Sequence, residues 1–333
     1  TNTSYFNSSD ASDDSIIQIA SDAPRGTAGT MAYDGTSQSV VAGHFFGTID
    51  LDETSIGDEW NSGESITVTL VDEDLNLNTR SNEDLDLNSN TVLLVPSLQI
   101  GSPLSVTSTG TVEGATVTGV DSFSQIARIS NSPGTDSSID IDMGFTVATL
   151  RTLVGESGID SIFLNWDLRS LLASGVNPTA VTITDGDTTL LTQIGAPSAQ
   201  QEMLELITLV ASGSSGLSET DNVFVHFAVT GHDIDSPNPF VVDFFTYGDA
   251  VNNAIYRLEL EETGDNTSTF EGLIDYIMIN QLNVDDATSY ANVVPIGVDI
   301  VIIVHTTMTD EDGPRVNFLD LGADGVSTQI ADQ

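Results

Sequence analysis

The stretch AIYRLELEETGDNTSTFEGLIDYIMI, residues 254–279, decides the fold class of this chain. Its first part, residues 254–261, alternates apolar and polar side chains, which is the period of a half-buried strand. Gly264, Asp265 and Asn266 then supply turn residues, and residues 269–279 return with many branched and aromatic side chains. This order of strand, turn and strand predicts a β-hairpin.

The same period of two recurs along most of the chain. Residues 64–71 place Ile66, Val68 and Leu70 on one face and polar side chains on the other. Further strand-like runs between turn clusters occur at residues 15–20, 38–46, 91–95, 114–120, 139–143, 222–230, 239–246 and 297–305. Their spacing is typical of antiparallel β-sandwiches, so we predict a mainly β protein.

The middle of the chain has a different pattern. Residues 198–201 read as a capping box, and the apolar residues that follow share one helical face, which predicts a helix over 198–211. Shorter helical candidates at 148–154 and 167–173 flank strand-like runs at 159–164 and 180–184. We therefore predict three parts, which are a β-sandwich region at 1–144, a mixed α/β segment at 145–215 and a second β-sandwich domain at 216–333.

The charge of the chain is strongly negative. Fifty Asp and Glu residues face seven basic residues, all arginine, which gives a net charge of −43 over 333 residues. Nucleic acid is excluded as a partner, because phosphate binding needs clustered basic side chains and the arginines are scattered. The chain has no cysteine and no apolar run long enough to span a membrane, so we expect neither disulfides nor a membrane span.

Acidic and amide side chains follow the 64–71 strand at regular intervals. Positions 1, 3, 5, 7 and 12 of segment 72–83 carry oxygen ligands, as in a calcium loop. These candidate ligands are Asp72, Asp74, Asn76, Asn78 and Glu83. Because Leu77 stands where an EF-hand needs Gly, and a strand rather than a helix leads in, we expect a calcium turn of another kind at a strand end. Calcium is the predicted structural cofactor.

Two further acidic pairs are candidates for a bound divalent ion. Asp84 and Asp86 alternate with Leu85 and Leu87, which fits either a second ion site or a strand with leucines inward and solvated acids outward. Asp310 and Asp312 follow strand 297–305 as Asp72 and Asp74 follow strand 64–71. The glycosylation candidates, in Asn-x-Ser/Thr sequences, are Asn2, Asn7 and Asn266.

Catalytic patterns are sparse. The four histidines show no spacing of a metalloprotease or of an iron-binding triad, and there is no nucleophile elbow or phosphate loop. We expect His226 to be a structural residue within a strand. Trp60 and Trp166 are too few for a sugar-binding platform, so core packing is expected for both. We predict that the protein is not an enzyme.

Four phrases of the sequence resemble surface-layer (S-layer) proteins of ammonia-oxidising archaea. They are GESITVTLVDEDLN at 63–76, RLELEETGDNTSTFEG at 257–272, NQLN at 280–283 and GPRVNFLDLGADGV at 313–326. The likeness is dense after about residue 220 and around residues 63–78. It implies tandem immunoglobulin-like domains in a much longer protein that assembles into a porous lattice outside a single membrane. We expect this chain to be a fragment or a shorter paralogue.

The resemblance and the charge together predict a structural, extracellular protein of the cell surface. Such a lattice, made of copies of one chain, would protect the cell and concentrate small cations such as ammonium in its negative field. A secreted adhesin or carbohydrate-binding β protein is the alternative, and would show exposed aromatic side chains around Trp60 or Tyr247. A secreted hydrolase would show a pocket with a strongly shifted carboxylate or histidine.

Overall fold

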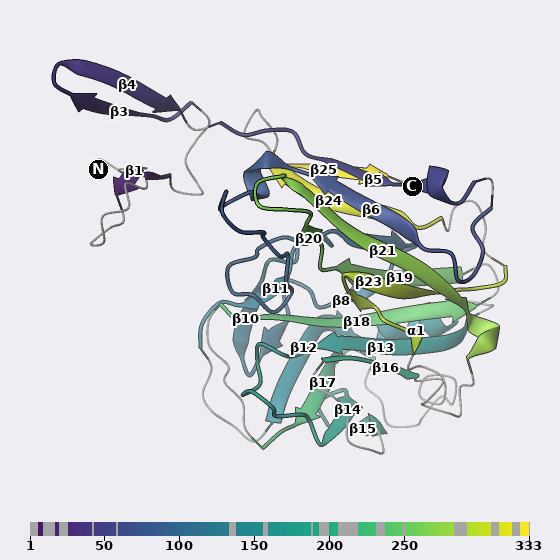
Figure 1. Cartoon of the computed structure of the whole chain (residues 1–333). Coiled ribbons are helices and arrows are strands. Elements are labelled where there is room, and N and C mark those ends of the chain that lie inside the picture. Colours follow the sequence, from purple (N-terminus) through teal and green to yellow (C-terminus); the bar gives the residue numbers. More distant parts are fainter. Residues whose placement is uncertain are drawn as a thin grey trace.

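The computed structural model describes residues 6–8, 17–19, 26–41, 43–57, 59–132, 138–155, 159–187, 189–192, 200–205, 219–230, 237–248, 251–282, 292–307, 313–321 and 327–332. Most of these residues lie in strands, and nearly all strand pairs are antiparallel. The prediction of a mainly β, antiparallel fold is therefore confirmed. Figure 1 shows a body of stacked sheets with the N-terminal strands extending away from it.

A five-stranded sheet forms one outer layer of the body. Strand β21 lies at its centre, antiparallel to β6 and parallel to β23. Strands β6 and β23 therefore run in opposite directions and end at opposite ends of this sheet. The members of the sheet are β5 (Thr48–Leu51), β6 (Ile66–Val71), β20 (Glu261–Glu262), β21 (Thr269–Met278) and β23 (Asp299–Val304).

The larger sheet curves through the rest of the body. One part consists of β7 (Ser97–Ile100), β19 (Val251–Leu258), β22 (Ile296–Gly297), β24 (Arg315–Leu321) and β25 (Ser327–Asp332). The other part consists of β8 (Leu104–Ser105), β9 (Thr111–Val112), β10 (Ala115–Thr118), β11 (Ala127–Ile129), β12 (Ser138–Thr146), β13 (Ile159–Asp167), β14 (Ala180–Thr184), β15 (Thr189–Thr192), β16 (Gln200–Glu205), β17 (Asn222–Ala228) and β18 (Pro239–Gly248). Helix α1 (Val147–Gly155) follows β12 directly.

Strand β18 separates two hydrophobic cores. All ten of its residues are buried, and alternate side chains point to opposite faces of a strand. Val241, Phe245 and Tyr247 pack in the core under the five-stranded sheet. The intervening Val242 and Phe244 pack in the second core, with β12, β14 and β17. The body is therefore a stack in which a shared middle layer buries apolar side chains on both faces.

Hydrogen-bonded ladders cross both predicted domain boundaries. Strand β6 pairs with β21 through six residue pairs, and β12 pairs with β17. Strand β13, from the predicted mixed segment, pairs with β18 along most of its length. The segments 1–144, 145–215 and 216–333 thus contribute to common sheets. The sequence pattern finds the strands but not their partners, because pairing depends on contacts far apart in the chain.

The 254–279 stretch changes sheets halfway. Its turn is closed by the pairs Glu261↔Glu271 and Glu262↔Phe270, as a hairpin predicts. Strand β19, however, belongs to the larger sheet, where it pairs with β7 and β18. The chain crosses between the two sheets at residues 259–260, so Leu258 and Leu260 both lie in the core between them.

The predicted helix over 198–211 is wrong in its described part. Residues Gln200–Glu205 form strand β16, which pairs antiparallel with β13. The apolar pattern fits either element over so short a run, and the otherwise unpaired edge of β13 favours a strand. Residues 206–211 lie outside the described residues. The candidate at 167–173 is also not a helix but the end of β13 followed by turns, whereas α1 confirms the candidate at 148–154.

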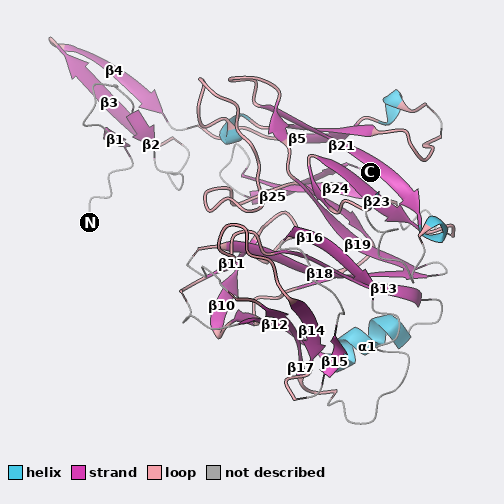
Figure 2. Ribbon diagram, turned by 60° about the horizontal axis from the view of Figure 1, so that its bottom comes forward, coloured by secondary structure: helices cyan, strands magenta, loops and turns pink. Residues whose placement is uncertain are grey.

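The N-terminal part and the short turns complete the structure. Strands β1 (Phe6–Ser8) and β2 (Ile17–Ile19) pair with each other, as do β3 (Ala28–Tyr33) and β4 (Thr36–Val41). Figures 1 and 2 both show the β3–β4 hairpin projecting from the body. The 3-10 turns are η1 (Glu53–Ser55), η2 (Glu73–Leu75) and η3 (Ile279–Gln281). None of the helices in the described ranges is long and apolar enough to cross a membrane.

Candidate functional site

Asp72 begins the acidic turn at the end of β6. Its backbone N–H donates to the carbonyl of Ser268 at 3.0 Å, and its Oδ1 accepts from the N–H of Asp74 at 2.8 Å. The carboxylate thereby caps η2, the role that Asp often has at the start of a helical turn. Asp72 is only 3% exposed, so its charge lies largely away from water.

Asp320, from β24, lies against Asp72 across Gly47. The N–H of Gly47 donates to Oδ2 of Asp320 at 3.1 Å. A Cβ atom on Gly47 would lie 3.4 Å from the Cβ of Asp72 and 3.5 Å from the Cγ of Asp320, so both acids flank this glycine. Burial raises the pKa of Asp72 to about 6, and the negative charges of Asp320, Asp74 and Glu73 add to that effect.

Sequence reasoning missed Asp320, which lies 248 positions from Asp72 and stands in a strand with no motif of its own. We name Asp72, Asp74 and Asp320 the acidic cluster. The 43–47 segment covers it, because Oδ2 of Asp74 accepts from the N–H of Phe45 at 3.1 Å and lies 3.3 Å from Nδ1 of His44. Backbone donors and a histidine therefore occupy much of the coordination space around Asp74.

Asn76 and Asn78 face different neighbours. Nδ2 of Asn76 donates to Oδ1 of Asn266 at 3.1 Å and to Oγ of Ser268 at 3.3 Å. Nδ2 of Asn78 donates to Oγ of Ser81 at 2.6 Å, within its own turn. These two amides thus stabilise turns through Nδ2, while Oδ1 of Asn76 is buried with no hydrogen-bond partner among the described residues. Asn266, a glycosylation candidate, is exposed at the turn before β21 with a φ of 102°.

Glu83 pairs with Glu262, a second residue that the sequence analysis did not identify. The N–H of Glu83 donates to Oε2 of Glu262 at 3.3 Å. Burial, followed by the neighbouring charge of Glu262, raises the pKa of Glu83. Burial also acts to raise the pKa of Glu262. Hydrogen bonds from the N–H groups of Ser268 and Thr267 outweigh this effect, so the pKa of Glu262 is lowered. The carboxylate of Glu262 thus stabilises the 263–268 turn through hydrogen bonds to its backbone.

The predicted calcium ligands do not form one cage. Calcium needs six to eight oxygens around one point, and within the described part of the chain no group of three or more acidic, histidine or cysteine side chains could hold a metal ion. Segment 72–83 therefore does not fit a calcium loop by itself. Asp84 and Asp86 are exposed while Leu85 and Leu87 are 4% and 2% exposed, as the alternative of solvated acids expects. Asp310, Asp312 and Asn2 lie outside the described residues, and of Asn7 only the backbone in β1 is described.

His226 has a carboxylate and a serine nearby, but not in the order that nucleophilic catalysis needs. Nδ1 of His226 lies 2.5 Å from Oδ1 of Asp140, its directly opposite residue in the β12–β17 ladder. Oγ of Ser138 donates to the other oxygen of Asp140 at 3.1 Å. The acid, not the histidine, stands in the middle, so the serine hydroxyl contacts a carboxylate and not the imidazole that a Ser-His-Asp triad needs. This is a cross-strand pair of the kind that stabilises a sheet.

A cavity of about 290 Å³ lies beside β18, with Asp243 and Arg257 in its wall. Nη2 of Arg257 lies 3.3 Å from Oδ1 of Asp243, and both side chains are nearly fully buried. Burial raises the pKa of Asp243, against the opposing effects of Arg257 and the hydroxyl of Ser105. Arg257 also donates to the carbonyls of Phe123 and Gln125. The two charges thus face each other, while Oδ2 of Asp243 and Nε of Arg257 have no hydrogen-bond partner among the described residues.

The aromatic residues do not form an exposed platform at the predicted places. Tyr247 is completely buried, and its hydroxyl lies 2.6 Å from that of Tyr256. Trp166 is also completely buried, as expected for core packing. Trp60 is half-buried, packs edge-on against Tyr276 with ring centroids 4.9 Å apart, and donates to the carbonyl of Glu64 at 2.6 Å.

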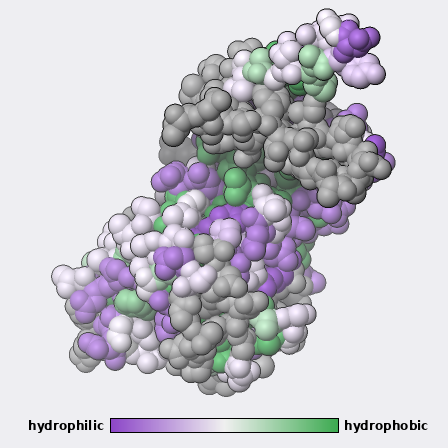
Figure 3. Space-filling model, turned by 90° about the vertical axis from the view of Figure 1, so that its left-hand side faces the viewer, coloured by the Kyte–Doolittle hydropathy of each residue, from purple (hydrophilic) through white to green (hydrophobic). Residues whose placement is uncertain are grey.

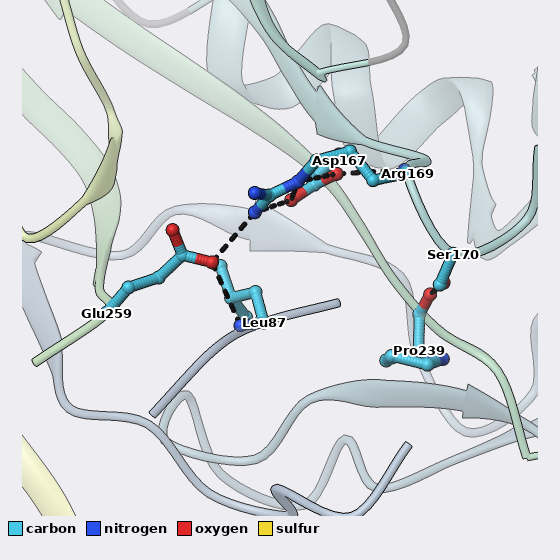
Figure 4. Close-up of polar contacts among 6 residues, drawn as sticks. All are labelled: Leu87, Asp167, Arg169, Ser170, Pro239 and Glu259. Carbon is cyan, nitrogen blue, oxygen red and sulfur yellow. Dashed lines mark hydrogen bonds and ion pairs between the residues drawn. The ribbon is translucent and has the colours of Figure 1, made fainter. Parts of the chain in front are cut away.

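A buried ionic network links the middle layer to the rest of the body (Figure 4). Arg169 donates from Nη2 to Asp167 at 2.6 Å and to Glu259 at 2.7 Å. Glu259 in turn accepts from the N–H of Leu87 at 2.9 Å. Glu259 lies where the chain crosses between sheets, so this network fixes the crossing against the end of β13.

The comparisons with known proteins assign no relative. No family model matches the chain, and no curated protein matches it.

Proposed function

We propose that this chain is a structural module of an acidic surface layer outside the cell, in which copies of the chain assemble and hold cations. The observation that carries this proposal is the net charge of −43 on a sheet-rich fold. On the face in Figure 3, hydrophilic residues cover much of the described surface of the body. A fixed negative field of this size concentrates small cations, ammonium among them, and excludes anions.

The polar chemistry of the described residues supports a structural role over catalysis. Arg257–Asp243 and Arg169–Asp167 are salt bridges inside the fold, although Oδ2 of Asp243 and Nε of Arg257 have no hydrogen-bond partner among the described residues. In the Ser138–Asp140–His226 group, the serine hydroxyl donates to Asp140 and not to the imidazole of His226. These features favour a protein that is not an enzyme. The resemblance to surface-layer proteins of ammonia-oxidising archaea supplies the cell-surface location and the immunoglobulin-like character of the sheets, which belong to the same proposal.

Calcium is the cation that we propose, because hard carboxylate oxygens dominate the charged groups of the chain. Since no group of three or more acidic side chains in the described residues could hold a metal ion, the proposal assigns cation binding to the exposed carboxylates of the surface.

Electron microscopy of the purified protein tests the assembly directly. We expect ordered sheets or filaments in the presence of calcium, and dispersed particles after chelation. The control replaces calcium with sodium chloride at matched ionic strength, which screens charge without bridging carboxylates. Identical dispersed particles in all three samples would contradict the proposal.

A further inference from the structure

The β3–β4 hairpin is a regular element that stands apart from the body. Six residue pairs join its strands, from Ala28↔Val41 to Tyr33↔Thr36. Asp34 and Gly35 close it with φ angles of 47° and 76°, which is the two-residue turn whose twist suits a hairpin. Figures 1 and 2 show it extending away from the sheets of the body.

Neither face of this hairpin is covered. None of its twelve strand residues is buried, and Tyr33 and Met31 are 88% and 52% exposed. Both lie on the same face as Val40, since Gly29 pairs with Val40 and alternate residues share a face. Among the described residues, no other strand pairs with β3 or β4. Two isolated strands are marginally stable in water, and a free edge is a template for pairing with another chain.

The charge distribution identifies the partner. Asp34 is the only charged side chain between residues 26 and 41, whereas the whole chain carries 50 acids in 333 residues. Two copies that approach through their bodies bring strongly negative surfaces together. Two copies that approach through the edge of this hairpin keep those charges apart and bring the faces that hold Tyr33 and Met31 side by side. A second copy of the same chain is therefore the partner that this hairpin, with its single charged side chain, is suited to bind.

We propose that the β3–β4 hairpin docks against the same hairpin of a second copy of this chain, edge to edge, to form a four-stranded sheet. Such a contact is self-complementary about a two-fold axis, because antiparallel strands satisfy each other equally. Backbone hydrogen bonds form along the free edge, and the apolar face that holds Met31, Tyr33 and Val40 becomes continuous across the pair. This inference rests on the proposed assembly of the chain and names one of its contacts.

Sedimentation and hydrogen exchange test this contact in the absence of divalent ions. The full chain is studied with a chelator in about 1 M sodium chloride, where the Debye length falls to about 3 Å and charge repulsion is screened. We expect a concentration-dependent dimer and slower amide exchange at residues 28–41 as concentration rises. Tyr33→Asp places a charge on the hairpin face and should weaken dimerisation at least about tenfold. Leu93→Asp is the matched control, because Leu93 is a 61% exposed apolar residue of the body.

The possible results distinguish the hairpin contact from the surface-layer proposal. A wild-type protein that stays monomeric, or protection that appears only outside residues 28–41, would overturn the hairpin contact. So would equal dimerisation by Tyr33→Asp and the wild type, with circular dichroism confirming that both are folded. If calcium still assembles the Tyr33→Asp variant as it does the wild type, the hairpin contact fails while the surface-layer proposal stands. If hairpin dimers form but calcium has no effect, the surface-layer proposal fails while the hairpin contact stands.

Discussion

At the scale of single residues, Asp72 links the acidic charge of the chain to its stability. Its pKa is about 6 in the folded protein, above the ordinary value of 3.8 that an unfolded chain would have. Because the folded form holds the proton more tightly, the free energy of unfolding falls as the pH rises from about 4 to about 6. The cost of the buried charge is fully present above that range and is absent below pH 3.8.

We predict that Asp72→Asn stabilises the protein at pH 7 when divalent ions are removed. The amide keeps an oxygen that can accept from the N–H of Asp74, but it carries no charge beside Asp320. The expected gain in the free energy of unfolding is about 3 kcal/mol, since the pKa of Asp72 rises from 3.8 to about 6 and one pKa unit corresponds to about 1.4 kcal/mol. Denaturant unfolding at pH 4 and pH 7 measures it, with the exposed Asp86→Asn as control. A variant that is less stable than the wild type at pH 7 would show that the buried charge of Asp72 does not destabilise the folded protein.

The sequence identified Asp72 and Asp74 as a special pair, because carboxylates cluster at the end of a predictable strand. It could not identify Asp320 or Glu262 as their neighbours. Both reach the site through tertiary pairing, Asp320 from β24 and Glu262 from the turn before β21. The spacing of 72–83 also predicted a common ligand sphere, and it could not predict that the Nδ2 atoms of Asn76 and Asn78 donate to other residues.

At the scale of elements, the network of Arg169 ties the end of β13 to the crossing between sheets. Asp167 and Glu259 are 3% and 8% exposed, and Arg169 is the cation that both of them contact. Burial raises the pKa of Glu259, while Arg169 and the N–H of Leu87 oppose that shift. The two carboxylates repel each other, so their burial depends on the guanidinium of Arg169 between them.

We predict that Arg169→Met lowers the free energy of unfolding by about 3–5 kcal/mol, the range for removing one partner of a buried ion pair. Chemical denaturation at pH 7 measures the loss, and the exposed Arg80→Met is the control. The double variant Arg169→Met/Glu259→Gln should regain part of the stability, because one of the uncompensated charges is gone. A loss no larger than that of Arg80→Met would contradict a structural role for the network.

Individual strands were predictable where the alternation was regular, as for residues 64–71, 139–143 and 180–184. Strand β16 was not, because a short amphipathic run fits a helix or a strand and only the open edge of β13 decides between them. The crossing at residues 259–260 was also beyond sequence analysis. Alternation continues through it without a break, although the chain moves from one sheet to another.

At the scale of the whole molecule, two cores share a middle layer, and the surface carries most of the negative charge. The fold class followed from composition and periodicity, but the stacking did not. Strand β18 reads in the sequence like other apolar strands, and only the contacts show that it serves both cores. This arrangement holds many carboxylates at fixed positions, so their mutual repulsion is built into the folded state.

Thermal unfolding in calcium and in sodium chloride of matched ionic strength tests the central claim most directly. An ion that binds only the folded form stabilises it by about 2.7 kcal/mol at a hundredfold excess over its dissociation constant. We predict that calcium raises the melting temperature above that in matched sodium chloride and that chelation reverses the gain. Equal melting temperatures in both salts would show that the carboxylates are only a solvated surface and would contradict a cation-binding module.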